Sequence, residues 1–275
     1  MPWFPDFVGA AELARVNLRS AGRADPVRQY FEALTDGDPD ELETVWPGSV
    51  VVYDPRAGEV RGHKQLRQFV RRNRAWLAER DAQIETVAST CTGGRAAVEL
   101  LAHLKDRDGR EVAWPLAVVA ESADERSVVF RTYCSQWPVD GQRHVRPSIL
   151  DPAPTGTDGV VGRYHAALRA GDAGAAVETF TPDGYLREPV GPSFTHRGTD
   201  ELTSYFTSAL SEGGIGIESC VLTDDGDRCA VEYNCVSWGE HALPPQAGVC
   251  VFERGSDSLL AAARVYDDIE APSRP

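Results

Sequence analysis

The 275-residue sequence has little positive charge and very little lysine. Lysine and arginine together number 28 against 42 aspartates and glutamates, which gives a formal charge of −14, and only Lys64 and Lys105 are lysines. Affinity for nucleic acids and for anionic membranes comes mainly from clustered basic side chains. The charge balance therefore argues against both as partners. The scarcity of lysine itself is typical of a GC-rich bacterial genome.

A long apolar run is also missing. No segment approaches the roughly 20 apolar residues that a membrane helix needs. An export signal consists of a basic stretch followed by an apolar run. The first residues, MPWFPDFVGAAELARV, do not show this pattern. We therefore expect a cytoplasmic protein without a membrane partner.

Patterns for metal binding and disulfide formation are absent as well. The sequence has six cysteines but no CxxC or HxxxH spacing, and the nearest pair is Cys229 and Cys235. Because most cysteines fall on predicted strands of a long chain without an export signal, we expect free, buried thiols. We find no phosphate-binding loop, dinucleotide motif or nucleophile motif. We expect neither a metal nor an organic cofactor.

What the sequence does contain is one long repeat. YFEALTDGD matches YHAALRAGD, RGHKQL matches RGTDEL, and RAAVEL matches RCAVEY. A repeat of about 130 residues is too long for a solenoid unit and indicates a duplicated domain. We expect a helical extension over residues 1–24, domains over 25–137 and 158–270, and a flexible linker over 138–157, where prolines and glycines gather without apolar periodicity.

Helices precede strands in both copies. In the second copy, helical patterns run to Gly171 and again from Thr199, a short strand between them ends at Glu188, and four strands follow near 216–224, 227–238, 244–253 and 258–268. The first copy predicts its four strands at 82–90, 94–105, 111–121 and 126–136. Strands gathered after helices predict an α+β fold with an antiparallel sheet.

Two tyrosine–carboxylate pairs occupy corresponding places in the copies. Tyr30 lies 24 residues before Asp54, and Tyr164 lies 24 residues before Glu188. A carboxylate in an apolar pocket has a raised pKa, so it can take and return a proton near neutral pH. The alternative is structural, because a tyrosine on the inner face of a helix often packs in the core and an acid at a strand end often caps a turn. The repeated spacing fits both interpretations, since duplication copies both kinds of residue.

The segment RYHAALRAGD, followed by VETFTPDGYLREPVG, resembles the nuclear transport factor 2-like superfamily, and within it the SnoaL-like polyketide cyclases and the ketosteroid isomerases. The resemblance covers residues 25–137 and 158–269. It implies two tandem conical domains, each with about three helices on a curved antiparallel or mixed sheet around an apolar cavity. In ketosteroid isomerases the acid at the Pro-Val-Gly motif is the base and the helical tyrosine donates a hydrogen bond to the enolate oxygen. The resemblance thus implies Glu188 and Asp54 as bases, with Tyr164 and Tyr30 as donors.

Other family features distinguish possible reactions. The second hydrogen-bond donor of the isomerases aligns near Gly248 and Leu116, neither of which can donate from its side chain, and this weakens a steroid isomerase interpretation. The tandem arrangement also resembles the epoxide-opening cyclases of polyether biosynthesis, which pair the strand-end acid with a second acid. Glu85 and Glu218 fit that second place. Alternatively, both glutamates belong to the solvent face of a strand.

These observations predict an acid/base enzyme without a cofactor, of the isomerase, cyclase or epoxide-opening type, acting on a hydrophobic small molecule. The candidate catalytic residues are Glu188, Tyr164, Glu218, Asp54, Tyr30 and Glu85. His196 and the segment Tyr266 to Asp268, near the mouth of the expected second pocket, are further candidates. The alternative function is a non-catalytic protein that binds a small ligand or another protein. We expect the two halves to pair within a monomer.

Overall fold

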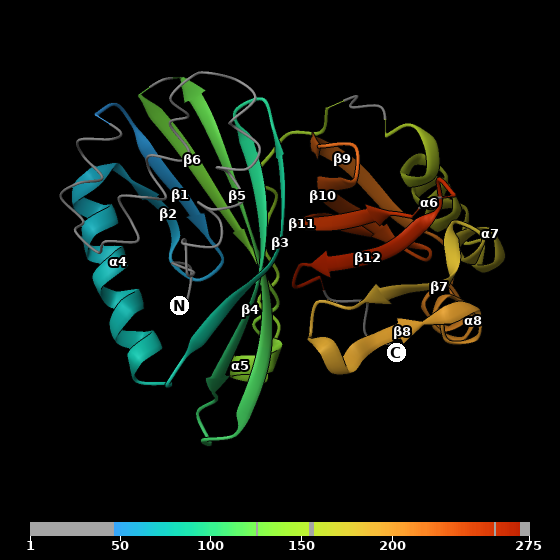
Figure 1. Cartoon of the computed structure of the whole chain (residues 1–275), viewed down its shortest axis with the longest axis horizontal. Helices are drawn as coiled ribbons and strands as arrows, with labels where there is room; N and C mark the ends of the chain where they lie inside the picture. Colours follow the sequence, from blue (N-terminus) through green and yellow to red (C-terminus); the bar gives the residue numbers. More distant parts are fainter. Residues whose placement is uncertain (1–46, 125, 154–156, 256, 270–275) are drawn as a thin grey trace. The chain divides into compact units, whose positions relative to one another are not determined.

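The computed structural model describes residues 47–124, 126–153, 157–255 and 257–269. The expected N-terminal extension, the first helices of the first copy and Tyr30 lie outside the described residues. The chain divides into two units, each with one sheet and packed helices (Figure 1). Unit 1 contains the residues up to Cys134 together with Pro138–Asp140. Unit 2 contains Ser135–Trp137 and the residues from Gly141 onward.

Unit 1 contains one six-stranded sheet in the order β2-β1-β6-β5-β4-β3. Neighbouring strands are antiparallel except β1 and β6, which are parallel. Helix α4 packs its apolar side chains Leu66, Phe69 and Val70 into the core of this unit. The elements are β1 (Val50–Asp54), β2 (Gly58–Arg61), α4 (Gly62–Ala78), β3 (Gln83–Thr92), β4 (Arg95–Lys105), β5 (Glu111–Asp124), β6 (Ser127–Tyr133) and α5 (Trp137–Asp140).

Unit 2 repeats this topology, with the strand order β8-β7-β12-β11-β10-β9. Strands β7 and β12 are parallel, so their C-terminal ends lie at the same edge of the sheet. The elements are α6 (Gly159–Ala170), α7 (Ala173–Val177), β7 (Phe180–Arg187), η1 (Pro192–Phe194), β8 (Thr195–Arg197), α8 (Gly198–Ala209), β9 (Ile215–Asp224), β10 (Arg228–Trp238), β11 (His241–Arg254) and β12 (Leu260–Tyr266).

Local sequence explains how α6 is placed over the sheet of unit 2. Its residues Val161, Tyr164 and Leu168 recur at helical spacing and are buried against the sheet. The helix ends at Gly171, whose φ of 69° suits glycine, and a Cβ at this position would approach the Gly214 nitrogen to 3.1 Å. Asp172 then caps α7 by accepting a hydrogen bond from the Ala175 N–H at 2.9 Å.

These features confirm two tandem α+β domains with mixed sheets. All six cysteines are free, and all except the half-buried Cys91 are buried. Within the described ranges, no helix is long and apolar enough to cross a membrane. The same residues contain no cluster of three or more His, Cys, Asp or Glu side chains that could hold a metal ion.

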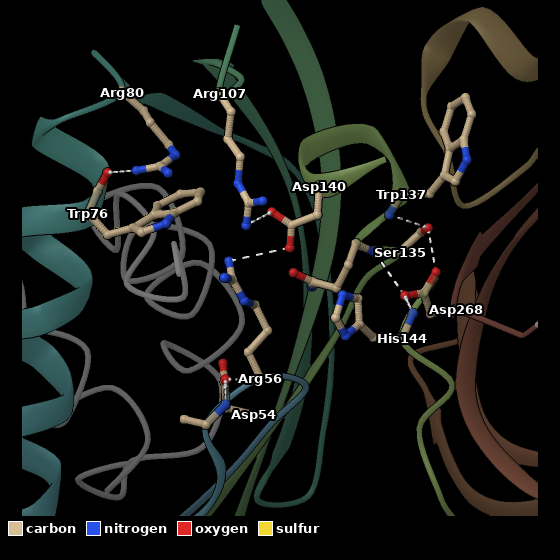
Figure 2. A network of polar contacts seen from close by, with 12 residues as sticks. Asp54, Arg56, Trp76, Arg80, Arg107, Ser135, Trp137, Asp140, His144 and Asp268 are labelled. Carbon is tan, nitrogen blue, oxygen red and sulfur yellow. Dashed lines mark hydrogen bonds and ion pairs between the residues drawn. The ribbon is translucent and has the colours of Figure 1, made fainter. Parts of the chain in front are cut away.

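The expectation of a flexible linker over residues 138–157 was wrong for most of its length. Pro138–Asp140 belong to α5, and Asp140 forms ion pairs in unit 1 with Arg56 at 3.7 Å and Arg107 at 3.4 Å (Figure 2). Further along, the Arg146 carbonyl accepts a hydrogen bond from the Ala247 N–H at 2.9 Å, and the Leu150 carbonyl accepts one from the Asn234 side chain at 2.9 Å. Strand residues of unit 2 therefore satisfy backbone groups of this segment.

Candidate functional site

A cavity of about 80 Å³ lies in unit 2 between the sheet and helices α6 and α8. Its lining is mostly aromatic and aliphatic, with Tyr164 and Leu168 from α6, Phe206 from α8, and Ile217 and Trp238 from the strands. Typical ligand pockets measure roughly 300–1,000 Å³. The cavity therefore accommodates a small group, such as one end of a ligand, unless lining side chains move.

Of the residues that the structure describes, one carboxylate lines this cavity. Asp267 follows the end of β12, is 7% exposed, and accepts a hydrogen bond from the Tyr233 hydroxyl on β10 at 2.5 Å. The Ile269 N–H donates a second hydrogen bond at 3.3 Å. Burial raises the pKa of Asp267 to about 6, although the two hydrogen bonds oppose this shift by favouring the ionised form. Asp267 can therefore gain or lose a proton close to neutral pH.

Two tyrosine hydroxyls remain available in the same cavity. Tyr164 on α6 and Tyr205 on α8 both line it, and neither hydroxyl has a hydrogen-bond partner among the described residues. Burial raises the pKa of both tyrosines well above the ordinary value, and the charge of Glu188 adds to the shift at Tyr205. Both hydroxyls therefore stay protonated and can donate hydrogen bonds to an oxygen atom of a ligand.

Among the described residues, the cavity lining contains no lysine or arginine, and its single histidine is neutral at pH 7. His165 on α6 is buried, and burial lowers its pKa to about 4, with a smaller contribution from the charge of Arg169. Among the described residues, a ligand group inside the cavity thus meets hydroxyls, one titratable carboxylate and apolar surface, without a positively charged side chain in the lining itself.

Glu188, the acid expected from the sequence, follows β7 and lies beside the cavity. Its Oε1 is 2.7 Å from Nε2 of His196, and both side chains are about a quarter exposed, at 26% and 27%. The His196 ring stacks on Tyr205 with a centroid distance of 4.4 Å and an interplanar angle of 28°. Glu188 is therefore connected to the cavity wall through His196 and Tyr205.

The two second acids expected from the sequence lie away from such a position. Ile217 on β9 lines the cavity, so the neighbouring Glu218 points to the opposite face, where it is exposed. In unit 1, Ile84 on β3 packs against the core, whereas the Glu85 side chain is 63% exposed and lies 3.5 Å from His103. Strand alternation places both glutamates on outer faces, which corrects the expectation that they complete a pocket.

Asp54 has a structural role in unit 1. It is 2% exposed, and its Oδ1 accepts hydrogen bonds from the N–H groups of Arg56 at 3.0 Å and Ala57 at 2.7 Å (Figure 2). It thereby caps the turn between β1 and β2, a contact that the structural interpretation expects. Its proposed partner Tyr30 lies outside the described residues.

Four polar residues in or beside the second cavity correspond to apolar residues in the first copy. Two features align the copies. Val231 and Val98 correspond because each pairs with the matching position of the next strand. Helices α8 and α4 correspond because each begins at a glycine that follows an arginine. The matches are Tyr233 with Leu100, Asp267 with Cys134, Tyr205 with Phe69, and His196 with Val60. All four residues of the first copy are buried in the core of unit 1.

Residues 27–130 and 161–257 match the family model described as the SnoaL-like domain. Because the two matches together span more than half of the chain, the protein belongs to the SnoaL-like family and carries two copies of its domain. This confirms the resemblance and the tandem arrangement expected from the sequence.

Several solved structures are similar to one domain of the chain. A putative polyketide cyclase from Sinorhizobium meliloti is 23% identical, with 38% of this chain and 92% of that chain covered and a TM-score of 0.33. SalBIII, described as an epoxide hydrolase/cyclase-like enzyme in pyran ring formation in salinomycin, is 25% identical, with 39% and 86% covered and a TM-score of 0.33. An NTF2-like protein of unknown function from Cytophaga hutchinsonii is 12% identical, with 39% and 87% covered and a TM-score of 0.32. Comparison with curated proteins gave no match.

Proposed function

We propose that the second domain is an acid/base enzyme that acts on a hydrophobic small molecule, with Asp267 as the group that takes and returns a proton. The observation that carries this proposal is the buried Asp267 carboxylate, which lines a mostly apolar cavity and has a pKa of about 6. A group with a pKa close to the working pH transfers protons most effectively. Perturbed carboxylates in enclosed cavities are characteristic of catalytic sites.

The surrounding hydroxyls supply the complementary chemistry. An oxygen atom of the substrate accepts a hydrogen bond from Tyr164 or Tyr205, which stabilises negative charge on that oxygen as a proton leaves a nearby atom. Asp267 receives this proton and returns it to another atom of the same molecule, so the overall reaction consumes no further reagent. Tyr233 holds the carboxylate in place through its 2.5 Å hydrogen bond.

Isomerisation, cyclisation and epoxide opening all use a proton transfer of this kind. In each case the ionised Asp267 is the active form when it acts as a base. We therefore expect kcat/KM to rise with pH through a pKa of about 6. A pH–rate profile of the parent protein checks this role, and a rate that falls over the same interval assigns Asp267 the acid role instead.

The test begins with native mass spectrometry of the full chain, to identify a small molecule that co-purifies with it. With that molecule or its precursor as substrate, we expect Asp267→Asn to lower kcat by about 10²–10⁴-fold while the ligand still binds. Glu218→Gln, on the outer face of β9, is the control and keeps the parent rate. Full turnover by Asp267→Asn rejects the proposal. Binding without any turnover by the parent protein supports the non-catalytic alternative.

A further inference from the structure

The residues that directly follow β12, among them Asp267, are next to a chain of hydrogen bonds to the segment Ser135–His144. This segment lies between the two copies in the sequence. The buried Asp268 accepts three hydrogen bonds from this segment, from the Ser135 hydroxyl at 2.6 Å, the Gln136 N–H at 3.0 Å and the His144 N–H at 2.5 Å (Figure 2). Hydrogen bonds to a buried carboxylate are strong because the acceptor is charged. The position of the backbone next to Asp267 therefore depends on this segment.

Arg143, in the same segment, reaches the residue that follows Asp268. Its Nη1 donates a hydrogen bond to the Ile269 carbonyl at 3.0 Å. Ile269 lines the cavity, and its own N–H donates to Asp267. Arg143 has no carboxylate within ion-pair distance among the residues that the structure describes. Its charge therefore acts on the cavity over a longer range.

We propose that Arg143 is a positioning residue for Asp267, and that the unit 2 residues of this segment, Ser135–Trp137 and Gly141–His144, are thus a working part of the second domain's site. This inference rests on the proposed role of Asp267. Arg143 orients Ile269 through a direct hydrogen bond, and its positive charge favours the ionised form of the nearby acid. The segment that joins the two copies consequently controls how readily Asp267 gives up its proton.

The charges around Asp267 act in opposite directions. Burial has the largest effect and raises the pKa of Asp267, and the negative charge of Asp268 raises it further. The hydrogen bonds from Tyr233 and the Ile269 N–H and the positive charge of Arg143 lower it. Arg143 also lowers the pKa of Tyr205 on the cavity wall. Without the Arg143 charge, one of the influences that counteract the effect of burial on the Asp267 pKa is lost. The pKa of Asp267 should therefore rise.

The inference is tested in the full chain by NMR titration of ¹³C-labelled aspartate carboxyl groups. The Asp267 signal is identified by its loss in Asp267→Asn. We expect Arg143→Gln to raise the Asp267 pKa by about half a unit or more, and Arg143→Lys to keep it close to the parent value because the charge remains. Arg169→Gln is the matched control, since Arg169 also donates to the carbonyl of a cavity residue, Ile217, at 3.2 Å. It should leave the Asp267 pKa unchanged.

An unchanged Asp267 pKa in Arg143→Gln, or an equal shift in Arg169→Gln, overturns the inference. A purely structural role for Arg143 predicts a lower unfolding temperature without a change in pKa. If Arg143→Gln does not fold, Arg143→Met is the second neutral variant: a raised Asp267 pKa supports the inference, and an unchanged value overturns it. The proposed function fails separately, through full turnover by Asp267→Asn, because the titration requires no substrate.

Discussion

At the scale of single residues, Asp267 combines its proposed function with a cost in stability. Its pKa is about 6 in the folded protein, compared with an ordinary value of 3.8, so the folded chain binds this proton more tightly than the unfolded chain does. The contribution of Asp267 to stability therefore falls as the pH rises from 3.8 to 6, and the loss is complete above that interval. At neutral pH the fold contains an ionised carboxylate that the unfolded chain would solvate better.

This predicts that Asp267→Asn stabilises the protein in a pH-dependent way. Asparagine keeps an oxygen acceptor for Tyr233 but has no charge to bury. We expect its free energy of unfolding, relative to the parent, to be about 2 kcal/mol higher at pH 7.5 than at pH 4.5. Denaturant unfolding at both pH values measures this difference. Asp224→Asn is the control: hydrogen bonding to Arg254 lowers the pKa of Asp224 below its ordinary value of 3.8, so Asp224 titrates below this interval and the effect of its substitution should be nearly the same at both pH values. A pH-independent effect of Asp267→Asn contradicts the assignment.

At the scale of the elements, apolar patterns in the sequence predicted most strands closely. The strands expected at 94–105 and 216–224 are β4 (Arg95–Lys105) and β9 (Ile215–Asp224). The same alternation also gives the orientation of Glu218, because Ile217 beside it belongs to the inner face. Family resemblance favoured Glu218 as a second acid despite that pattern. The hydrogen bonds of the expected linker could not be predicted from the sequence, because its partners lie on distant strands. A segment rich in proline and glycine also shows no apolar periodicity.

The hydrogen bonds from the segment Ser135–His144 to Asp268 predict that Asp268 contributes to the stability of the protein. Asp268→Ala removes the acceptor of three hydrogen bonds and leaves the N–H groups of Gln136 and His144 without this partner. We expect the free energy of unfolding to fall by about 2–4 kcal/mol, because the buried Gln136 N–H and the partly buried His144 N–H keep a desolvation cost when they lose their partner. Asp151→Ala, at an exposed position further along the chain and outside this segment, should change the free energy of unfolding by less than about 0.5 kcal/mol. Similar small effects in both variants, measured by denaturant unfolding, contradict a role for Asp268 in holding the segment.

At the scale of the whole molecule, the repeat predicted two domains of one fold but gave no division of function between them. The matched pairs Tyr30–Asp54 and Tyr164–Glu188 are equally spaced, so they made the copies look equivalent. The difference lies at positions that do not match, where Leu100 and Cys134 replace Tyr233 and Asp267. The sequence already contains these differences. Their meaning depends on knowing that Tyr233 and Asp267, which are distant in sequence, form a hydrogen bond in a cavity.

We therefore expect one ligand to bind per chain, in the second domain. Native mass spectrometry of the complex with the co-purified molecule measures the stoichiometry. The double variant Tyr233→Leu/Asp267→Cys, which introduces the residues of the first copy, should lose turnover, since it removes both the carboxylate and its hydrogen-bond donor. Asp54→Asn should keep both stoichiometry and rate, because asparagine can accept the same two hydrogen bonds from the turn. Two ligands per chain, or loss of turnover in Asp54→Asn, would show that the first domain also contains a working site.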